Sequence, residues 1–313
     1  MKAVQISRYG GNDVLEITQD APNPSPIKGQ VLVEVYAVGV NPVDWKVRAG
    51  YFKETIPLTK PVTLGGDFSG VVAGVGGSAS DLKVGDAVYG YASILSGGSG
   101  SFAEFVAANT GTVARTPKVN FVEAAALPLA GVGALQALEE HIKLQRGHKI
   151  LVHGGAGGIG SIAIQIAKSA GAYVATTVSG DDRAYVKGLG ADEVIDYKQE
   201  AFEERLKDFD AVFDTVGGET TERSFKVLKK GGMLVSMLGQ PNPELARRYG
   251  VTAIGQMTHT NTKRLNRLVQ DVDSGNVEAQ IYKVFPLDNA KEAFKLLGEG
   301  HPRGKVVLDV KRS

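Results

Sequence analysis

A glycine-rich turn between an apolar segment and a helical one is the feature that most constrains this chain. Residues 149–153 are predicted to form a strand, and Gly154, Gly157 and Gly160 lead into a helix expected over residues 158–169. Glycines let the backbone approach a pyrophosphate and let helix and strand pack closely. The free amides and the positive end of the helix dipole then face the phosphates. The turn therefore predicts a dinucleotide-binding fold, and the competing interpretation is a glycine-rich turn that binds nothing.

The segments around this turn alternate between strand and helix patterns. Further strands are expected at residues 173–178, 193–195, 211–214 and 233–237, and further helices at residues 182–189 and 220–228. Such alternation is typical of a parallel, doubly wound α/β sheet, in which ligands bind at the carboxyl ends of the strands.

The two ends of the chain have a different pattern. Strands are expected at residues 31–40, 70–75, 87–90, 281–285 and 305–310, with a helix at residues 289–297. The β-rich character is thus interrupted by the α/β region and then resumes. We expect a β-rich catalytic domain at 1–122, a dinucleotide-binding domain at 123–267 and a return to the first domain at 268–313.

Composition excludes several other classes of protein. The chain has no cysteine, which excludes disulfides, thiolate zinc sites and iron–sulfur clusters. A formal net charge of +1 gives no reason to expect a nucleic-acid or membrane-surface partner. No segment approaches the roughly 20 apolar residues of a membrane-spanning helix, and the N-terminus becomes polar too early for a signal peptide. We therefore expect a cytoplasmic location.

The residues after the second strand of the α/β region favour NADPH over NADH. NAD-specific turns usually place an acidic residue about 20 positions further on, at the end of that strand. Here the strand ends in Thr177 and Ser179, and Arg183 follows. A hydroxyl and a guanidinium suit a 2′-phosphate, because arginine supplies paired donors to phosphate oxygens. Asp181 and Asp182 leave two alternatives open, since either is able to hold a ribose diol or to cap the next helix.

Several further motifs are shared with a known family. They are Gly39-Val-Asn41-Pro-Val-Asp44, Leu64-Gly-Gly-Asp67-Phe-Ser-Gly70, Val84-Gly-Asp86, Ala125-Ala-Leu-Pro128-Leu-Ala-Gly131, Phe213-Asp-Thr-Val-Gly217 and Arg303-Gly-Lys-Val-Val307. With the glycine-rich turn, they make the whole chain resemble the zinc-independent quinone oxidoreductases of the medium-chain dehydrogenase/reductase superfamily, which include zeta-crystallin. The resemblance implies a GroES-like β-rich catalytic domain, a Rossmann domain and assembly as a homodimer.

The resemblance also implies chemistry without zinc. Zinc-dependent members carry a cysteine at about the position of Asn41 and a His-Glu pair where this chain has Gly66 and Asp67. Because these ligands are missing, a catalytic zinc site of that kind is excluded and no metal is expected.

The site residues of the family are carried over through the matching motifs. Asn41 and Asp44 match residues near the nicotinamide, and Tyr51 lies near an aromatic position of the same pocket, so these three are the expected catalytic residues. The expected cofactor contacts are Asn41, Gly157, Gly158, Ile159, Gly160, Ser179, Arg183, Tyr197, Val216, Leu238, Gly239 and Lys305. One position departs from the pattern. Relatives commonly show Leu-Ala-Gly-Leu-Thr-Ala, whereas this chain has Gly133 in place of the threonine and so lacks one hydroxyl contact to the nicotinamide.

Four of these residues also have purely structural interpretations. Asn41 is placed to bond the local backbone at the end of a strand, and Asp44 to cap the turn at residues 45–49. Tyr51 is equally suited to packing, and Tyr197 to the half-buried edge of the sheet.

Together these features predict an NADPH-dependent, metal-free oxidoreductase. Direct hydride transfer suits a quinone or an α,β-unsaturated carbonyl, which accepts hydride without a Lewis acid. Asn41 and Tyr51 are expected to donate hydrogen bonds to the anion left behind. Two alternatives stay open: a non-catalytic NADPH-binding protein with a crystallin-like, regulatory or RNA-binding role, and an enoyl-thioester reductase.

Overall fold

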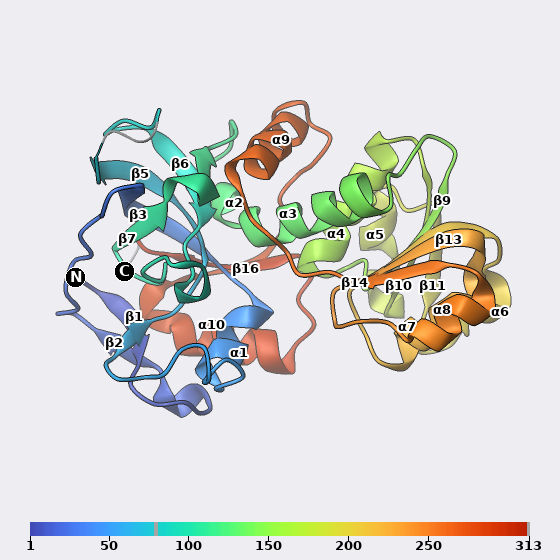
Figure 1. The fold of residues 1–313 in the computed structure, drawn as a ribbon, viewed down its shortest axis with the longest axis horizontal. Coiled ribbons are helices and arrows are strands. Elements are labelled where there is room, and N and C mark those ends of the chain that lie inside the picture. The colour runs from blue at the N-terminus through green and yellow to red at the C-terminus, as the bar shows by residue number, and fades with distance from the viewer. Residues whose placement is uncertain (78–80, 312–313) are drawn as a thin grey trace. The chain divides into compact units, whose positions relative to one another are not determined.

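The computed structural model describes residues 1–77 and 81–311, which divide into two units (Figure 1). Unit 1 comprises Met1–Leu129, Thr260–Asp273 and Ala279–Ser313, and unit 2 comprises Ala130–His259 and Ser274–Glu278. Unit 1 is β-rich and unit 2 is built on a parallel sheet. The predicted fold class, a β-rich domain with a doubly wound α/β domain, is confirmed.

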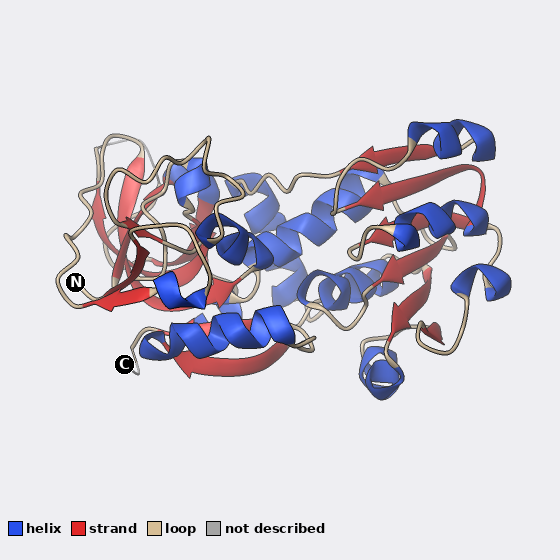
Figure 2. Cartoon of the chain, turned by 90° about the horizontal axis from the view of Figure 1, so that it is seen from below, coloured by secondary structure: helices blue, strands red, loops and turns tan. Residues whose placement is uncertain are grey.

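Unit 2 has a parallel sheet in the strand order β11-β10-β9-β12-β13-β14. The strands are β9 (Lys149–His153), β10 (Tyr173–Val178), β11 (Glu193–Asp196), β12 (Phe209–Asp214), β13 (Leu228–Ser236) and β14 (Thr252–Gly255). The α-helices are α3 (Pro128–Leu135), α4 (Gly158–Ser169), α5 (Arg183–Gly188), α6 (Phe202–Arg205), α7 (Glu219–Ser224) and α8 (Pro243–Tyr249). Helix α3 continues into a π-helix, η4 (Gln136–His141), and the first two residues of α3 belong to unit 1. Figure 2 shows these helices beside the parallel strands. Reversal of the strand order between β9 and β12 creates the switch point at which such sheets bind ligands.

Helix α4 illustrates why this sequence folds as it does. Ile162, Ala163, Ile166 and Ala167 are buried, as expected for residues that recur every three to four positions on one helical face. Gln165 lies between them and is only half-buried. The strands on which the helix packs, β9 and β10, are almost entirely buried, as is usual for parallel strands covered on both faces.

Unit 1 has two sheets, one in the order β2-β1-β4 and one in the order β15-β16-β3-β5-β6-β8, with β7 also paired to β3. The strands are β1 (Ala3–Ile6), β2 (Glu16–Thr18), β3 (Gln30–Val40), β4 (Val62–Thr63), β5 (Asp67–Val75), β6 (Ala87–Tyr91), β7 (Phe105–Asn109), β8 (Val113–Arg115), β15 (Ile281–Pro286) and β16 (Lys305–Asp309). The helices are α1 (Pro42–Arg48), α2 (Phe121–Ala125), α9 (Thr262–Asp273) and α10 (Ala290–Glu299).

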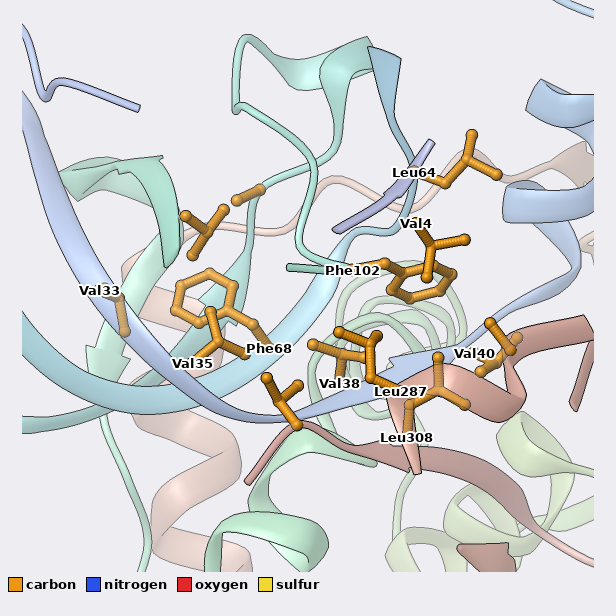
Figure 3. Close-up of a cluster of buried hydrophobic side chains, with 14 of the residues drawn as sticks. Val4, Val33, Val35, Val38, Val40, Leu64, Phe68, Phe102, Leu287 and Leu308 are labelled. Atoms are coloured by element: carbon orange, nitrogen blue, oxygen red, sulfur yellow. The ribbon is translucent and has the colours of Figure 1, made fainter. Parts of the chain in front are cut away.

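The core of unit 1 joins segments that are distant in the sequence. Alternate residues of β3 point to the same face and meet Phe68, Phe102 and Leu308 (Figure 3). Because β16 pairs with β3 in the register Val306↔Val40, the last strand of the chain lies directly beside the segment that leads into α1. This pairing brings Lys305 close to Asn41.

Some predicted elements have other bounds in the structure, among them the helix expected at 220–228 and the strand expected at 233–237, which begins at Leu228. The helix expected at 220–228 is shorter, because α7 ends at Ser224 and Leu228 already pairs with Phe209 as the start of β13. Helix α9, through which the sequence division at residue 267 passes, belongs as a whole to unit 1. Its Leu265 carbonyl accepts a hydrogen bond from the Tyr89 hydroxyl at 2.7 Å, and Thr262 bonds the carbonyls of Thr110 and Val113.

In the part of the chain that the structure describes, no helix combines the length and the apolar character needed to cross a membrane.

Candidate functional site

The glycine-rich turn joins β9 to α4 as predicted. Gly157 is the N-cap of the helix, and its amide donates to the Gly154 carbonyl at 3.0 Å. Among the described residues, the next three amides, those of Gly158, Ile159 and Gly160, have no acceptor. Free amides at the start of a 12-residue helix, together with the helix dipole, are suited to bind a pyrophosphate.

Two glycines of the turn are required by packing. A Cβ on Gly160 would lie 2.2 Å from the Gly154 carbonyl oxygen, and a Cβ on Gly155 would lie 2.0 Å from the hydroxyl oxygen of Thr176 on β10. Gly157 has more room, since the nearest atom to its Cβ would be 3.4 Å away. Space for a ligand is thus left at Gly157, while Gly155 and Gly160 hold the helix close to the sheet.

The three residues expected to bind a 2′-phosphate meet at one edge of the sheet. Ser179 follows β10, Tyr197 follows β11, and Arg183 begins α5. The Arg183 guanidinium donates to the Val194 carbonyl at 2.8 Å and to Glu200 at 3.1 Å, and its side chain is half exposed. The Ser179 hydroxyl donates to Asp182 at 3.1 Å. A phosphate at this edge would therefore share Arg183 with Glu200.

The opposite half of the same sheet edge carries exposed apolar side chains. Val216 follows β12 and Leu238 follows β13, and each side chain is 51% exposed. Backbone amides of Val216 and Gly217 are held by the buried Asp214 carboxylate at 2.8 and 3.1 Å. Gly239, with φ of +122°, follows Leu238. Apolar groups on a preordered backbone are suited to cover the ribose and ring of a cofactor.

His153 at the end of β9 has a structural role. It is fully buried, and its two ring nitrogens lie 2.9 Å from the hydroxyl oxygens of Thr177 and Ser224. Burial lowers the pKa of His153 to about 4, so the imidazole is neutral at physiological pH. Both ring nitrogens are occupied by these hydroxyls, so His153 is not available to a substrate.

A second polar cluster, in unit 1, contains Asn41, Asp44, Asp67 and Lys305, all of them at least nine-tenths buried. The Asn41 amide nitrogen donates to Asp67 at 2.8 Å, and its amide oxygen accepts from the Lys305 ammonium. Asn41 was expected to donate to a substrate anion. Its side chain is engaged on both its nitrogen and its oxygen, and the nitrogen also donates to the local Gly39 carbonyl at 3.4 Å, the kind of bond that the structural interpretation gave it.

Lys305 and Asp67 form a buried ion pair with 3.4 Å between the ammonium nitrogen and the carboxylate oxygen. The ammonium also donates to the Val40 carbonyl at 3.2 Å, so its three donors are directed to Val40, Asn41 and Asp67. Asp67 in addition accepts from the Leu129 amide at 2.9 Å. Lys305, expected as a cofactor contact, thus places its charge inside this cluster.

Asp44 is bound less completely than Asp67. Within the described residues its carboxylate accepts one hydrogen bond, from the Asn41 backbone amide at 2.7 Å. This bond caps the start of α1, as the structural interpretation of Asp44 predicted. Burial, together with the nearby charge of Asp67, raises the pKa of Asp44 to about 8. The raised pKa favours the protonated form of the Asp44 carboxyl at neutral pH.

Tyr91 lies beside this cluster and was not singled out in the sequence. It pairs directly with Asp67 across β5 and β6, and its ring lies over Gly66, where a Cβ would be 2.2 Å from a ring carbon. Burial, then the charges of Asp44 and Asp67, raise the pKa of Tyr91, which keeps its hydroxyl protonated. Tyr51, by contrast, is 69% exposed and stacks edge-on against Trp45.

Two known protein families match parts of this chain. Residues 27–118 match the family described as "Alcohol dehydrogenase GroES-like domain", and residues 189–308 match the family described as "Zinc-binding dehydrogenase". The second description names zinc, although this chain has no cysteine and carries Asn41, Gly66 and Asp67 at the zinc-ligand positions discussed above.

Full-length relatives are found among curated proteins and solved structures. A 2-methylene-furan-3-one reductase of Solanum lycopersicum is 41% identical over 98% of this chain and 79% of its own length. A chloroplastic NADPH-dependent alkenal/one oxidoreductase of Arabidopsis thaliana is 39% identical over the same shares of the two chains. The solved quinone oxidoreductase of Coxiella burnetii is 36% identical, with a TM-score of 0.92 over 99% of each chain.

Proposed function

Because the chain belongs to the zinc-independent quinone oxidoreductases of the medium-chain dehydrogenase/reductase superfamily, we propose that it is an NADPH-dependent reductase of quinones or α,β-unsaturated carbonyls. The single observation that carries this proposal furthest is the buried Asp44 carboxyl, which accepts one hydrogen bond within the described residues and lies in a cluster without the zinc ligands that zinc-dependent members use. Such a group is suited to reactions that consume one hydride and one proton.

The residues of unit 2 fit the cofactor. The free amides of Gly158 to Gly160 would hold the pyrophosphate, and Ser179, Arg183 and Tyr197 the 2′-phosphate. Val216, Leu238 and Gly239 would contact the half of the cofactor that ends in the nicotinamide. When bound, NADPH supplies the hydride, and the protein supplies orientation and exclusion of water.

The residues of unit 1 supply the proton. After hydride has been added to the β-carbon of an enone, the α-carbon needs a proton and the carbonyl oxygen a hydrogen-bond donor. Asp44 holds a proton at neutral pH, and the Tyr91 hydroxyl stays protonated beside it. We assign proton donation to Asp44 and the hydrogen bond to the carbonyl oxygen to Tyr91. Asn41 and Lys305 then act as positioning residues that hold Asp67 and the start of α1 in place.

Parallel turnover assays test the reaction. NADPH oxidation would be followed with a quinone, an alkenal or enone, and a crotonyl thioester. We expect consumption with the quinone or the enone. Consumption with the thioester alone would indicate an enoyl-thioester reductase. NADPH binding without oxidation by any acceptor would support the non-catalytic alternative and refute the proposal.

Cofactor preference is tested at Arg183. Arg183→Glu is expected to weaken NADPH binding by about tenfold to a hundredfold and NADH binding much less, because a charge-assisted bond to phosphate contributes roughly 1.5–3 kcal/mol. Glu200→Gln is the matched control: it releases Arg183 from its ion pair and should leave NADPH binding intact or tighter. Equal weakening of both cofactors by Arg183→Glu would contradict the phosphate role.

Location and assembly are part of the same proposal. The proposal includes a cytoplasmic location, whereas the Arabidopsis relative is chloroplastic. A homodimer is supported by β14, the edge strand of the unit 2 sheet in the described residues, whose outward Ala253 carbonyl and Gly255 amide bond the Gln240 side chain and would exchange it for the backbone of a second copy.

A further inference from the structure

The segment that follows β14 is bonded tightly to the start of the helical region of unit 2. Gln256 donates from its amide nitrogen to the Gly133 carbonyl at 2.9 Å. Gln136 donates to the Met257 carbonyl at 3.0 Å and accepts from the His259 amide at 3.0 Å. Three side-chain bonds to backbone therefore fix residues 256–259 beside α3.

These bonds place the Thr258 hydroxyl directly against Gly133. A Cβ added to Gly133 would lie 3.1 Å from the Thr258 hydroxyl oxygen and 3.8 Å from the δ-carbon of Ile159. A threonine at position 133 would place the atoms beyond its Cβ in or beside the same small space. The space therefore has room for the hydroxyl of only one of the two residues, and in this chain that residue is Thr258.

The Thr258 hydroxyl has no hydrogen-bond partner among the described residues, and the residue is only half-buried. The buried amide oxygen of Gln256, two residues earlier, is likewise unpartnered. The three neighbouring bonds fix the backbone of this segment, so the half-exposed hydroxyl is held at a position where a ligand is able to bond it.

The position along the sheet edge indicates which part of the ligand it meets. The 2′-phosphate residues lie after β10 and β11, and the pyrophosphate turn lies after β9. A dinucleotide that crosses the switch point extends from there over the ends of β12, β13 and β14. Thr258 follows β14, and its hydroxyl and Ile159 of the turn both lie within 4 Å of the Cβ that Gly133 would carry, which places it on the nicotinamide half.

We propose that the Thr258 hydroxyl binds the carboxamide of the nicotinamide and replaces the side chain that Gly133 lacks. The carboxamide is the hydrogen-bonding group of that ring, and a hydroxyl is able to donate to its oxygen or accept from its nitrogen. The inference rests on the proposed NADPH-dependent function and adds a residue that sets the orientation of the ring.

Binding measurements with two ligands test the contact. NADPH carries the nicotinamide, whereas 2′-phospho-ADP-ribose has the same adenosine and pyrophosphate without it. Thr258→Val, which keeps the side-chain shape, should weaken NADPH binding about fivefold to tenfold, as expected for one hydrogen bond. Binding of 2′-phospho-ADP-ribose should be unchanged, and Thr258→Ser should bind NADPH like the wild type. Equal losses for both ligands, or no loss for NADPH, would overturn the proposal.

A reciprocal exchange tests the shared space. Gly133→Thr alone should weaken NADPH binding because two hydroxyl groups collide, and Gly133→Thr with Thr258→Ala should restore it. Failure of the double variant to recover, with an unchanged melting temperature, counts against the exchange. If the wild type binds NADPH and the variants behave as described but no acceptor is reduced, the contact stands and the proposed reaction fails. If the wild type does not bind NADPH, both fail.

Discussion

Asp44 and Asp67 are two carboxyl groups buried beside one ammonium group, that of Lys305. Complete ionisation would leave an uncompensated negative charge out of contact with water, which is costly. Asp67 accepts bonds from Asn41, Leu129 and Lys305, whereas Asp44 accepts one from a backbone amide. Burial raises the pKa of both carboxyl groups, and the larger number of hydrogen bonds to Asp67 favours placing the proton on Asp44.

Replacement of Asp44 by asparagine should remove the proton and keep the cap, because an amide oxygen also accepts from the Asn41 amide. The wild-type rate should fall as pH rises through about 8, where the carboxyl loses its proton. Asp44→Asn should lower kcat by about 10²–10⁴-fold and abolish this decline. The pH profile of kcat/KM is the measurement. A decline at the same pH in the variant would show that another group donates the proton.

Lys305→Met should destabilise unit 1, because Asp67 then loses its counter-charge while it stays buried. The expected loss is about 3–5 kcal/mol of unfolding free energy at neutral pH. Without the ammonium, the pKa of Asp67 rises further above its value in the unfolded chain. Protonation on acidification then relieves the cost, so the deficit relative to wild type should shrink as the pH falls below neutral.

The double variant Lys305→Met with Asp67→Asn is the control for that prediction. It should recover part of the loss and show no such pH dependence, as measured by denaturant unfolding. If the loss of unfolding free energy in Lys305→Met alone does not depend on pH, it comes from lost packing of the lysine methylene groups and not from an unpaired buried charge on Asp67.

At the scale of elements, the turn between β9 and α4 combines two requirements that its glycines meet separately. Gly155 and Gly160 allow close packing, whereas Gly157 leaves room in front of the free amides. Gly155 and Gly160 are therefore needed for the stability of the fold, whereas the open space at Gly157 is needed for ligand binding.

Gly160→Ala should therefore destabilise the fold by about 1–3 kcal/mol and weaken NADPH binding, because the new methyl group would overlap the Gly154 carbonyl. Gly188→Ala, in α5, is the matched control. No atom lies within 4 Å of the Cβ it would add, so it should stabilise by about 0.5–1 kcal/mol. Thermal unfolding with and without NADPH separates the two effects, and a stable Gly160→Ala variant would refute the packing argument.

The bounds of helices and strands were predicted well where the local sequence pattern determines them, and less well where pairing with another strand determines them. The bounds of α4 and β10 follow from apolar periodicity and glycine, and both agree with the structure. The end of α7 was wrong, because the start of β13 is set by its pairing with β12. Tyr91 was missed for a similar reason: its position beside Asp67 depends on the antiparallel register of β5 and β6, which local sequence does not encode.

At the scale of the whole molecule, the exposed edge strand β14 predicts assembly. A homodimer would have about twice the chain mass of 33.0 kDa in light scattering after size exclusion. Ile254→Lys, on β14, places like charges on both copies of this edge and should shift the protein to the monomer while the fold is retained. A monomeric wild type, or a dimer that withstands the substitution, would refute pairing through this strand.

The pairing of β16 with β3 has a consequence for how the chain acquires its fold during synthesis. Residues 130–259 of unit 2 are continuous and include every strand of its sheet, so this sheet is able to form while the ribosome is still translating. Unit 1 has to wait, because its central strand lacks one neighbour until residues 305–309 have emerged. The same late strand delivers Lys305, so the buried carboxylate of Asp67 gains its counter-charge only in the last step of folding.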